Sequence, residues 1–307
     1  MKTQDRDMQS YISIIDSFIN QADLEKEQAS EIKKELHTYI KTKFEKKEWV
    51  HPEITKFCTD WYREFYRLVG NTDPYAKVKN ESNIKAQEIL NGITATSWQE
   101  CIAAGIIGNK IDYGACLVHN VDLNEIKKDF EDLNNLRLLI DDTEQLIESL
   151  KTANSVLFLV DNDGEIIFDT LLLKKIAGFI PKEKIFIMGK ENPMLNDATV
   201  EDLRNLSFDN YGTIVSTGSN CFGLHTEDVS EECKELLKNT DLIIAKGQAY
   251  LEFFTEYNFR NVFNILRVKH PVKNLALGTL PSSSNAIINS KRYANFGKDY
   301  FKQNGTS

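Results

Sequence analysis

The pentapeptide "DNDGE", residues 161–165, directly follows the apolar run "VLFLV". Such a run is typical of a buried strand, and a soluble protein seldom places this much carboxylate at the end of one. The carboxylate and amide oxygens of Asp161, Asn162 and Asp163 are hard ligands that suit Mg²⁺, Mn²⁺ or a similar divalent ion. The alternative is a helix-capping turn, because Asp and Asn are favoured N-cap residues. Capping accounts for one acid and not for the cluster, so both interpretations stay open at this point.

Further polar residues follow the later apolar runs. In an open parallel sheet, ligands bind at the carboxyl ends of the strands, so these residues should form a coherent chemical set. After "KIFIMG", Thr199 and Asp202 have the pattern of a capping pair, which leaves Asn196 and Asp197 without that role. Asp197 is therefore a candidate third oxygen ligand, with an ordinary surface turn as the alternative.

Two segments are candidates for holding an anion. After "GTIVS", the small residues Thr217, Gly218 and Ser219 could present backbone N–H groups to an anion, although a simple loop explains them as well. After "DLIIA", Lys246 stands with Gly247 at the start of a helix, where N–H groups and the helix dipole favour phosphate. The alternative for Lys246 is a solvated lysine at a strand end.

Asn109 and Asp112 interrupt an apolar helical stretch in the first half of the chain. They are three residues apart and share one face of a helix. Because buried polar groups are costly unless satisfied, these two side chains either bond to neighbouring backbone or line a cleft between the two halves.

Composition excludes several classes of protein. The chain has 307 residues and a formal net charge of −9, and its Lys and Arg residues form no basic tract, which argues against a nucleic-acid partner. Five cysteines form no Cys-x-x-Cys pair, which favours free thiols in a reducing compartment. The first residues are too polar for a signal peptide, and no apolar run reaches the ~18 residues of a membrane span. We therefore expect a cytoplasmic protein that binds neither membrane nor nucleic acid; its oligomeric state stays open.

Two common catalytic patterns are missing from the chain. No Gly-x-Ser-x-Gly elbow occurs, and no Gly-x-Gly-x-x-Gly follows an apolar run, so neither a serine hydrolase nor a dinucleotide enzyme is indicated. The five histidines lack the spacing of a zinc site.

The elements that would position these residues change in type near residue 150. Residues 1–150 have apolar residues at helical spacing and predict a mainly α-helical N-terminal domain. In residues 151–307, short runs that are apolar on both faces alternate with helical segments. This alternation predicts an α/β domain that carries the site, a three-layer α/β/α sandwich with a mainly parallel sheet.

The motifs "DNDGE", "NDAT", "STGSNCFGL" and "DLIIAKGQAYLE", in this order, resemble those of the damage-control phosphatase family, also called domain of unknown function 89. The segments "DPYAKVKNESNIKA" at 73–86, "AAGIIGNKIDYGA" at 103–115 and "RVKHPV" at 267–272 resemble further stretches of that family. Each motif is short, but their number and order make the resemblance specific, and it runs from about residue 57 to about residue 290.

The resemblance implies a metal-dependent phosphatase that acts on small phosphorylated metabolites, such as sugar phosphates or damaged and surplus phosphometabolites. The implied cofactor is a divalent ion, Mn²⁺, Co²⁺, Ni²⁺ or Mg²⁺. The residues that match the family's site are the metal ligands Asp161, Asn162 and Asp197, the phosphate-contacting Lys246, and the neighbouring Asn109 and Asp112.

The chain departs from the family's pattern at two places. Asp163 stands where the family usually has a small residue, and Ala249-Tyr250 replaces the usual Gly-Asn. An added acid beside the metal could change metal choice or weaken phosphate binding. Two alternatives to a phosphatase stay open, a carboxyl methyltransferase-like activity and a non-catalytic protein that binds a metal or phosphometabolite on the same fold.

Overall fold

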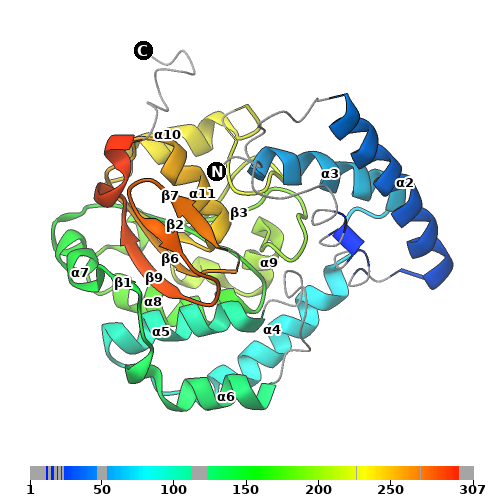
Figure 1. Ribbon diagram of the computed structural model, residues 1–307. Coiled ribbons are helices and arrows are strands. Elements are labelled where there is room, and N and C mark those ends of the chain that lie inside the picture. The colour runs from blue at the N-terminus through cyan, green and yellow to red at the C-terminus, as the bar shows by residue number, and fades with distance from the viewer. Residues whose placement is uncertain are drawn as a thin grey trace.

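The computed structural model describes residues 24–46, 54–111, 123–225, 227–269 and 271–296, together with Ile12, Ile15, Asp16, Ile19 and Ala22. A seven-stranded sheet lies between two layers of helices, and a further group of helices lies beside the sheet (Figure 1). This arrangement confirms the predicted α/β fold, a three-layer sandwich with a mainly parallel sheet and an additional helical part.

The strands of the sheet follow the order β1-β9-β6-β5-β2-β3-β4, in which every neighbouring pair is parallel except β6 and β9. The strands are β1 (Ile140–Asp141), β2 (Val156–Leu159), β3 (Ile185–Gly189), β4 (Thr213–Ser216), β5 (Leu242–Lys246), β6 (Val262–Arg267) and β9 (Asn285–Asn289), and the hairpin strands β7 (Val272–Asn274) and β8 (Gly278–Leu280) pair separately. The apolar runs "VLFLV", "KIFIMG", "GTIVS" and "DLIIA" correspond to β2, β3, β4 and β5. All residues of β2 and β5 are buried, which agrees with a parallel sheet that is covered on both faces.

Helices cover both faces of the sheet, and others lie beside it. The described α-helices are α2 (Lys26–Glu45), α3 (Ile54–Val69), α4 (Ala76–Leu90), α5 (Trp98–Gly108), α6 (Leu123–Glu131), α7 (Thr143–Thr152), α8 (Glu165–Ile176), α9 (Val200–Asn205), α10 (Glu231–Asn239) and α11 (Gln248–Glu256). On one face, α5, α7 and α8 share a core with the sheet that includes Ile106, Leu146 and Leu173. On the other face, α10 and α11 pack through Leu237 and Phe254. No helix in the described part of the chain has the length and apolar character needed to cross a membrane.

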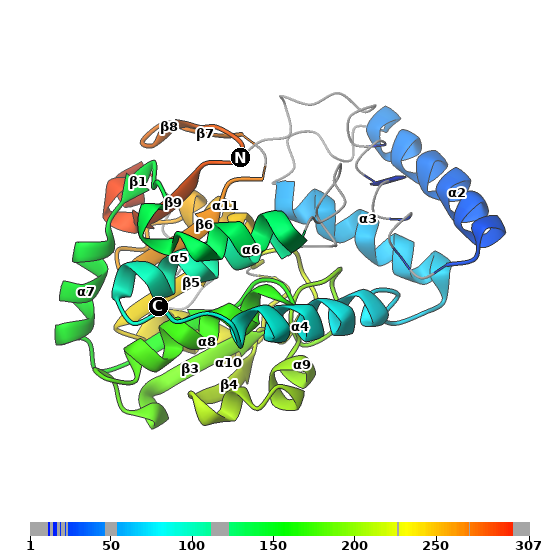
Figure 2. The ribbon, with the colours of Figure 1, turned by 90° about the horizontal axis from the view of Figure 1, so that it is seen from below.

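The helical part beside the sheet has its own core. In this core, α2 and α3 contribute Leu36, Trp61 and Phe65, and the loop after β3 adds Met194 and Leu195. The helix α4 runs from this part toward α8 and α9 (Figure 2). The helical part therefore contacts the segment that follows β3, at the carboxyl edge of the sheet.

The predicted division into residues 1–150 and 151–307 stays a prediction. The structure adds that several elements before residue 150 belong to the layers of the sandwich. Ile140–Asp141 pairs with β9 as an edge strand, and α5 packs closely against α8. The thiols of Cys101, Cys221 and Cys233 are free and buried, as expected, whereas Cys58 is half-buried and Cys116 lies outside the described residues.

Gly108→Ala tests the close approach of α5 to α8. A Cβ at residue 108 would lie 2.6 Å from Cδ2 of Phe168, whose ring is buried and stacked on Phe130. Overpacking of this kind costs about 1–3 kcal/mol, so urea denaturation should show a lower free energy of unfolding. Gly92→Ala is the matched control, because its Cβ would make an ordinary contact 3.5 Å from the Ile89 carbonyl. Equal stability of the two variants would contradict the argument.

Candidate active site at the carboxyl edge of the sheet

The three predicted metal ligands lie together at the carboxyl ends of β2 and β3. An isolated antiparallel bridge pairs the backbones of Asn162 and Asp197. Next to it, the N–H of Ala198 donates to the carbonyl of Asp161 at 2.9 Å. The loop after β3 is thus fixed against the turn after β2, and the polar residues that follow two neighbouring strands meet, as the sheet topology predicts.

The side chains around Asp161 form a buried network of oxygens and amides. Oδ2 of Asp161 accepts hydrogen bonds from Nδ2 of Asn109 at 3.1 Å and from Nδ2 of Asn162 at 2.9 Å. Nδ2 of Asn109 also donates to Glu165. Oδ1 of Asn109 is buried and has no hydrogen-bond partner among the residues that the structure describes. Asn109 therefore lies at the site that the resemblance implies, whereas Asp112 lies outside the described residues.

Gly247 allows Asp161 to reach this position. Its φ is +85°, and a Cβ there would lie 2.0 Å from Oδ2 of Asp161. The backbone after β5 therefore contacts the carboxylate directly, which only a residue without a side chain permits.

Lys246 lies beside the site and is fully buried. Its Nζ donates to Oε1 of Glu165 and to Oδ1 of Asp169, both at 2.6 Å, and to the carbonyl of Gly105 at 3.3 Å. Burial alone would lower the pKa of Lys246, but the carboxylates of Asp169 and Glu165 raise it above its ordinary value, so the lysine is a cation. Burial raises the pKa of Asp169, which Lys246 opposes.

This ion cluster differs from what the sequence suggested. The sequence predicts that Lys246 holds a phosphate. In the structure its Nζ bonds to the carboxylates of Glu165 and Asp169 instead. Contact between Lys246 and a phosphate stays a prediction, and it requires the lysine to leave at least one of these carboxylates.

Lys190 is a cation at the site that the sequence analysis missed. It follows β3 directly and is buried, and its Nζ donates to the carbonyls of Cys221 and Gly223, both at 2.7 Å. The same Nζ lies 3.7 Å from Oδ2 of Asp197 and 5.2 Å from the ring centre of Tyr250. Its position immediately after the run "KIFIMG" was the available signal, because the other candidates also follow strands directly.

The loop of Thr217, Gly218 and Ser219 is folded on itself. The N–H of Thr217 donates to the carbonyl of Gly189, that of Gly218 to Oγ of Ser216, and that of Ser219 to Oγ1 of Thr217. Each N–H group therefore has an acceptor within the protein. Phosphate binding by these groups stays a prediction, and it requires an exchange of hydrogen bonds.

Asp163 does not lie among the oxygens around Asp161. Its carboxylate is fully buried and contacts α4, accepting from Nδ2 of Asn83 at 2.8 Å and lying 3.5 Å from Nζ of Lys79. Burial raises the pKa of Asp163 to about 7, and Asp202 adds to this effect, whereas Lys79 and Asn83 oppose it. Conversely, burial would lower the pKa of Lys79, but its carboxylate neighbours raise it.

The residues present fit a hard divalent cation. Within the described ranges, no group of three or more His, Cys, Asp or Glu side chains is arranged to hold a metal ion. The candidate set instead joins the carboxylates of Asp161 and Asp197 with amide oxygens of Asn162 and Asn109. Oxygen ligands of this kind, few of them charged, are what Mg²⁺ and Mn²⁺ accept. The unpartnered Oδ1 of Asn109 is the observation that favours such an ion over an entirely internal network.

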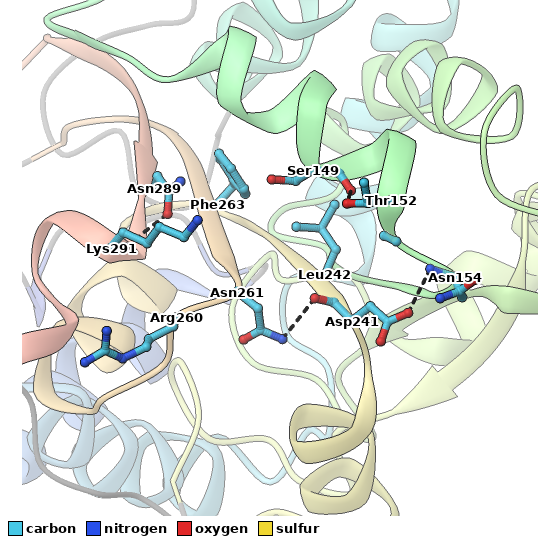
Figure 3. A pocket seen from close by; sticks show the side chains of 11 residues that line it. Ser149, Thr152, Asn154, Asp241, Leu242, Arg260, Asn261, Phe263, Asn289 and Lys291 are labelled. Carbon is cyan, nitrogen blue, oxygen red and sulfur yellow. Dashed lines mark hydrogen bonds between the residues drawn. The ribbon is translucent and has the colours of Figure 1, made fainter.

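A cavity of about 330 Å³ lies at the opposite edge of the sheet (Figure 3). It is lined by the first residues of β5 and β6, among them Leu242 and Phe263. Its polar groups bond within the protein: Asp241 accepts from the N–H of Asn154 at 2.7 Å, and Asn261 donates to the carbonyl of Thr240 at 2.8 Å. Because ligands of parallel sheets bind at the carboxyl edge, this cavity is not the candidate active site.

The fold and the site define an α/β/α protein with an acidic, amide-rich centre at a carboxyl sheet edge. The damage-control phosphatase ARMT1-like domain matches residues 6–278, and the chain therefore belongs to this family. This match confirms the resemblance found in the motifs.

Individual relatives agree with this assignment. The chain is 34% identical to a damage-control phosphatase of Pyrococcus horikoshii, PH1575, over 213 residues, which are 68% of this chain and 72% of the relative. It is 31% identical to a damage-control phosphatase of Archaeoglobus fulgidus over 229 residues, 71% of this chain and 76% of the relative. The crystal structure of a DUF89 family protein from Pyrococcus horikoshii superposes with a TM-score of 0.79 at 26% identity, covering 94% of this chain and 99% of that one.

Gly247→Ala tests whether the position of Asp161 matters for activity. The new Cβ would displace the carboxylate, and misplacing a catalytic group by about 1 Å costs on the order of 100-fold in rate. Phosphatase activity, measured as kcat/KM on a phosphomonoester, should therefore fall by that order. Gly70→Ala is the control: its φ of +67° brings comparable backbone strain, but no atom lies within 4 Å of the new Cβ. Similar losses in both variants would show that strain, and not the displacement of Asp161, is responsible.

Proposed function

We propose that this protein is a metal-dependent phosphomonoester hydrolase that acts on small phosphorylated metabolites. The observation that supports it most is the convergence of Asp161, Asn162 and Asp197 beside the unpartnered Oδ1 of Asn109. The family to which the chain belongs supports the phosphatase activity. Sugar phosphates and damaged or surplus phosphometabolites are the substrates we propose, since relatives carry the name damage-control phosphatase.

The charges around the site support a divalent ion. The turn after β2, the start of α8 and the loop after β3 contribute five buried carboxylates, those of Asp161, Asp163, Glu165, Asp169 and Asp197. Three buried lysines lie against them, Lys79, Lys190 and Lys246. Because Asp73 and Asp202 also contact Lys79, carboxylates outnumber lysines at this edge of the sheet, and this excess favours a bound cation. Mn²⁺, Co²⁺, Ni²⁺ and Mg²⁺ are all candidates, because each accepts oxygen ligands.

The residues of the chain would divide the work as follows. Asp161, Asp197 and the amide oxygens of Asn162 and Asn109 hold the cation. When bound, this ion supplies a Lewis acid that polarises a phosphoryl oxygen and an attacking water. Lys190 adds a fixed positive charge on the side of Asp197, where it attracts the phosphate and stabilises charge that develops on its oxygens.

Removal of the metal is the decisive experiment. Purified protein is treated with a chelator, and hydrolysis of a generic phosphomonoester and of a panel of sugar phosphates is measured after Mn²⁺, Co²⁺, Ni²⁺ or Mg²⁺ is added back. We expect activity to disappear with the chelator and to return with at least one of these ions. Hydrolysis that continues at an unchanged rate after treatment with the chelator would contradict the metal dependence. A protein that binds the ion but hydrolyses no member of the panel would favour the non-catalytic alternative.

Asp161→Ala and Asp197→Ala test the proposed ligands one at a time. Each should lower kcat/KM by on the order of 100-fold or more, the scale found when one electrostatic stabiliser of a transition state is removed. Circular dichroism should show a folded protein. Asp209→Ala removes a carboxylate from an exposed position and should leave activity unchanged. Retained activity in either ligand variant would remove that residue from the metal set.

Lys246→Met distinguishes a supporting lysine from one that binds phosphate. Without the lysine, Glu165 and Asp169 become uncompensated buried charges, which costs about 3–5 kcal/mol of stability. Thermal and urea unfolding should show this loss, and adding Asp169→Asn should recover part of it. Lys182→Met, at an exposed position, is the control. If the single variant instead keeps its stability and only raises KM, the lysine acts on phosphate and not on the carboxylates.

A further inference from the structure

Helix α4 contacts the metal-site turn through two side chains on one face. Lys79 and Asn83 are four residues apart on α4 and therefore point in the same direction. Both reach segment 161–164, and Figure 2 shows α4 running past α8 and α9 at this edge of the sheet.

Asn83 holds the turn by two hydrogen bonds. Its Nδ2 donates to Oδ1 of Asp163 at 2.8 Å, and its Oδ1 accepts from the N–H of Gly164 at 2.6 Å. Gly164 has a φ of +84° and precedes the first residue of α8. One amide group thus contacts both residues that directly follow Asp161 and Asn162, and it selects one of the conformations open to the glycine.

Lys79 connects the same turn to the segment that carries Asp197. Its Nζ lies 2.6 Å from Oδ2 of Asp202, 3.5 Å from Oδ2 of Asp163 and 3.3 Å from Oδ2 of Asp73. Asp202 forms the capping box of α9 with Thr199, and Thr199 lies two residues after Asp197. The lysine therefore lies between the cap of α9 and the turn after β2.

The backbones of the two segments also contact each other directly. The N–H of Asp163 donates to the carbonyl of Asn196 and the N–H of Ala198 donates to the carbonyl of Asp161, both at 2.9 Å, beside the bridge of Asn162 with Asp197. The side chains of Asp161 and Asp197 bear like charges. Side chains that hold such a turn from outside set the spacing of the ligands and thereby the affinity for the ion.

We propose that Lys79 and Asn83 are positioning residues which, through Asp163, fix the spacing between Asp161–Asn162 and Asp197 and so set the affinity of the site for its divalent ion. This inference rests on the proposed metal-dependent function. It gives Asp163 a role: the acid that departs from the family's pattern is the contact by which α4 holds the turn.

The test measures ion affinity separately from turnover. Binding of Mn²⁺ to the metal-free protein is followed by calorimetry, together with kcat and KM on a phosphomonoester at saturating Mn²⁺. Asn83→Ala should weaken Mn²⁺ binding about 10- to 100-fold, the usual effect of removing a residue that orients metal ligands. At saturating Mn²⁺, kcat should recover most of its wild-type value. Asn80→Ala, on the exposed face of the same helix, is the matched control and should bind Mn²⁺ like the wild type.

An exchange of the two partners provides the second variant. Asn83→Asp combined with Asp163→Asn keeps a donor facing an acceptor, keeps an acceptor for the Gly164 N–H, and leaves a carboxylate near Lys79. It should bind Mn²⁺ within about threefold of the wild type, whereas Asp163→Ala alone, which removes the acceptor for Asn83, should resemble Asn83→Ala. This comparison holds even if Asn83→Ala fails to fold.

Hydrogen exchange separates failure of this inference from failure of the proposed function. Amide exchange at Asp163, Gly164 and Ala198 should accelerate in Asn83→Ala and in Lys79→Met, and it requires neither metal nor substrate. A wild type that binds no ion would overturn the proposed function. A wild type that binds Mn²⁺, with Asn83→Ala binding equally well and exchanging equally slowly, would overturn the positioning role alone.

Discussion

The structure depends on keeping several carboxylates buried at one edge of a parallel sheet. Moving an isolated carboxylate from water into a protein interior costs several kcal/mol, so each one needs a cation or strong donors close by. Lys246 meets this need for Glu165 and Asp169, and Lys79 meets it for Asp163. The lysines come from different elements, β5 and α4, so the carboxylates constrain how these elements pack around β2.

This constraint explains the positions of two glycines, Gly105 and Gly247. Gly105 brings the backbone of α5 next to Lys246 and Asp169, and a Cβ there would lie 2.8 Å from Oδ1 of Asp169. Gly247 brings the backbone after β5 against Asp161. Both glycines let main chain approach a charged group, which places backbone dipoles and not hydrocarbon beside it. The missing side chain at Gly105 therefore permits two things at once, the close packing of α5 on α8 and the hydrogen bond from Lys246 to the Gly105 carbonyl.

The sequence predicted the strands that carry the site better than it predicted which charged side chains form ion pairs there. The runs that became β2 and β5 are continuous and apolar, and the polar residues at their ends lie at the carboxyl edge of the sheet, whereas the roles assigned to those residues stay predictions. The pairing of Lys246 with Glu165 and Asp169 was missed, because it depends on β5 lying next to β2. Along the chain β3 and β4 stand between them, and no local pattern encodes that order. Strand β9 was missed for a related reason: the short run "NAIIN" lies between serine residues and is a strand through its pairing with β6 and β1, which no local pattern encodes.

Asp163 shows why residue type alone does not assign a role within an acidic cluster. By sequence it is the neighbour of two candidate metal ligands and looks like a third. By position it lies in the turn after β2, a strand whose successive side chains point to opposite faces of the sheet. This turn ends at Gly164, whose φ is +84°. That turn directs Asp161 toward Asn109 of the sandwich and Asp163 toward Asn83 of α4. Two carboxylates that are two residues apart thus contact different parts of the molecule. If Asp163 has the proposed positioning role, a change in the packing of α4 would reach the proposed metal ligands through Asp163.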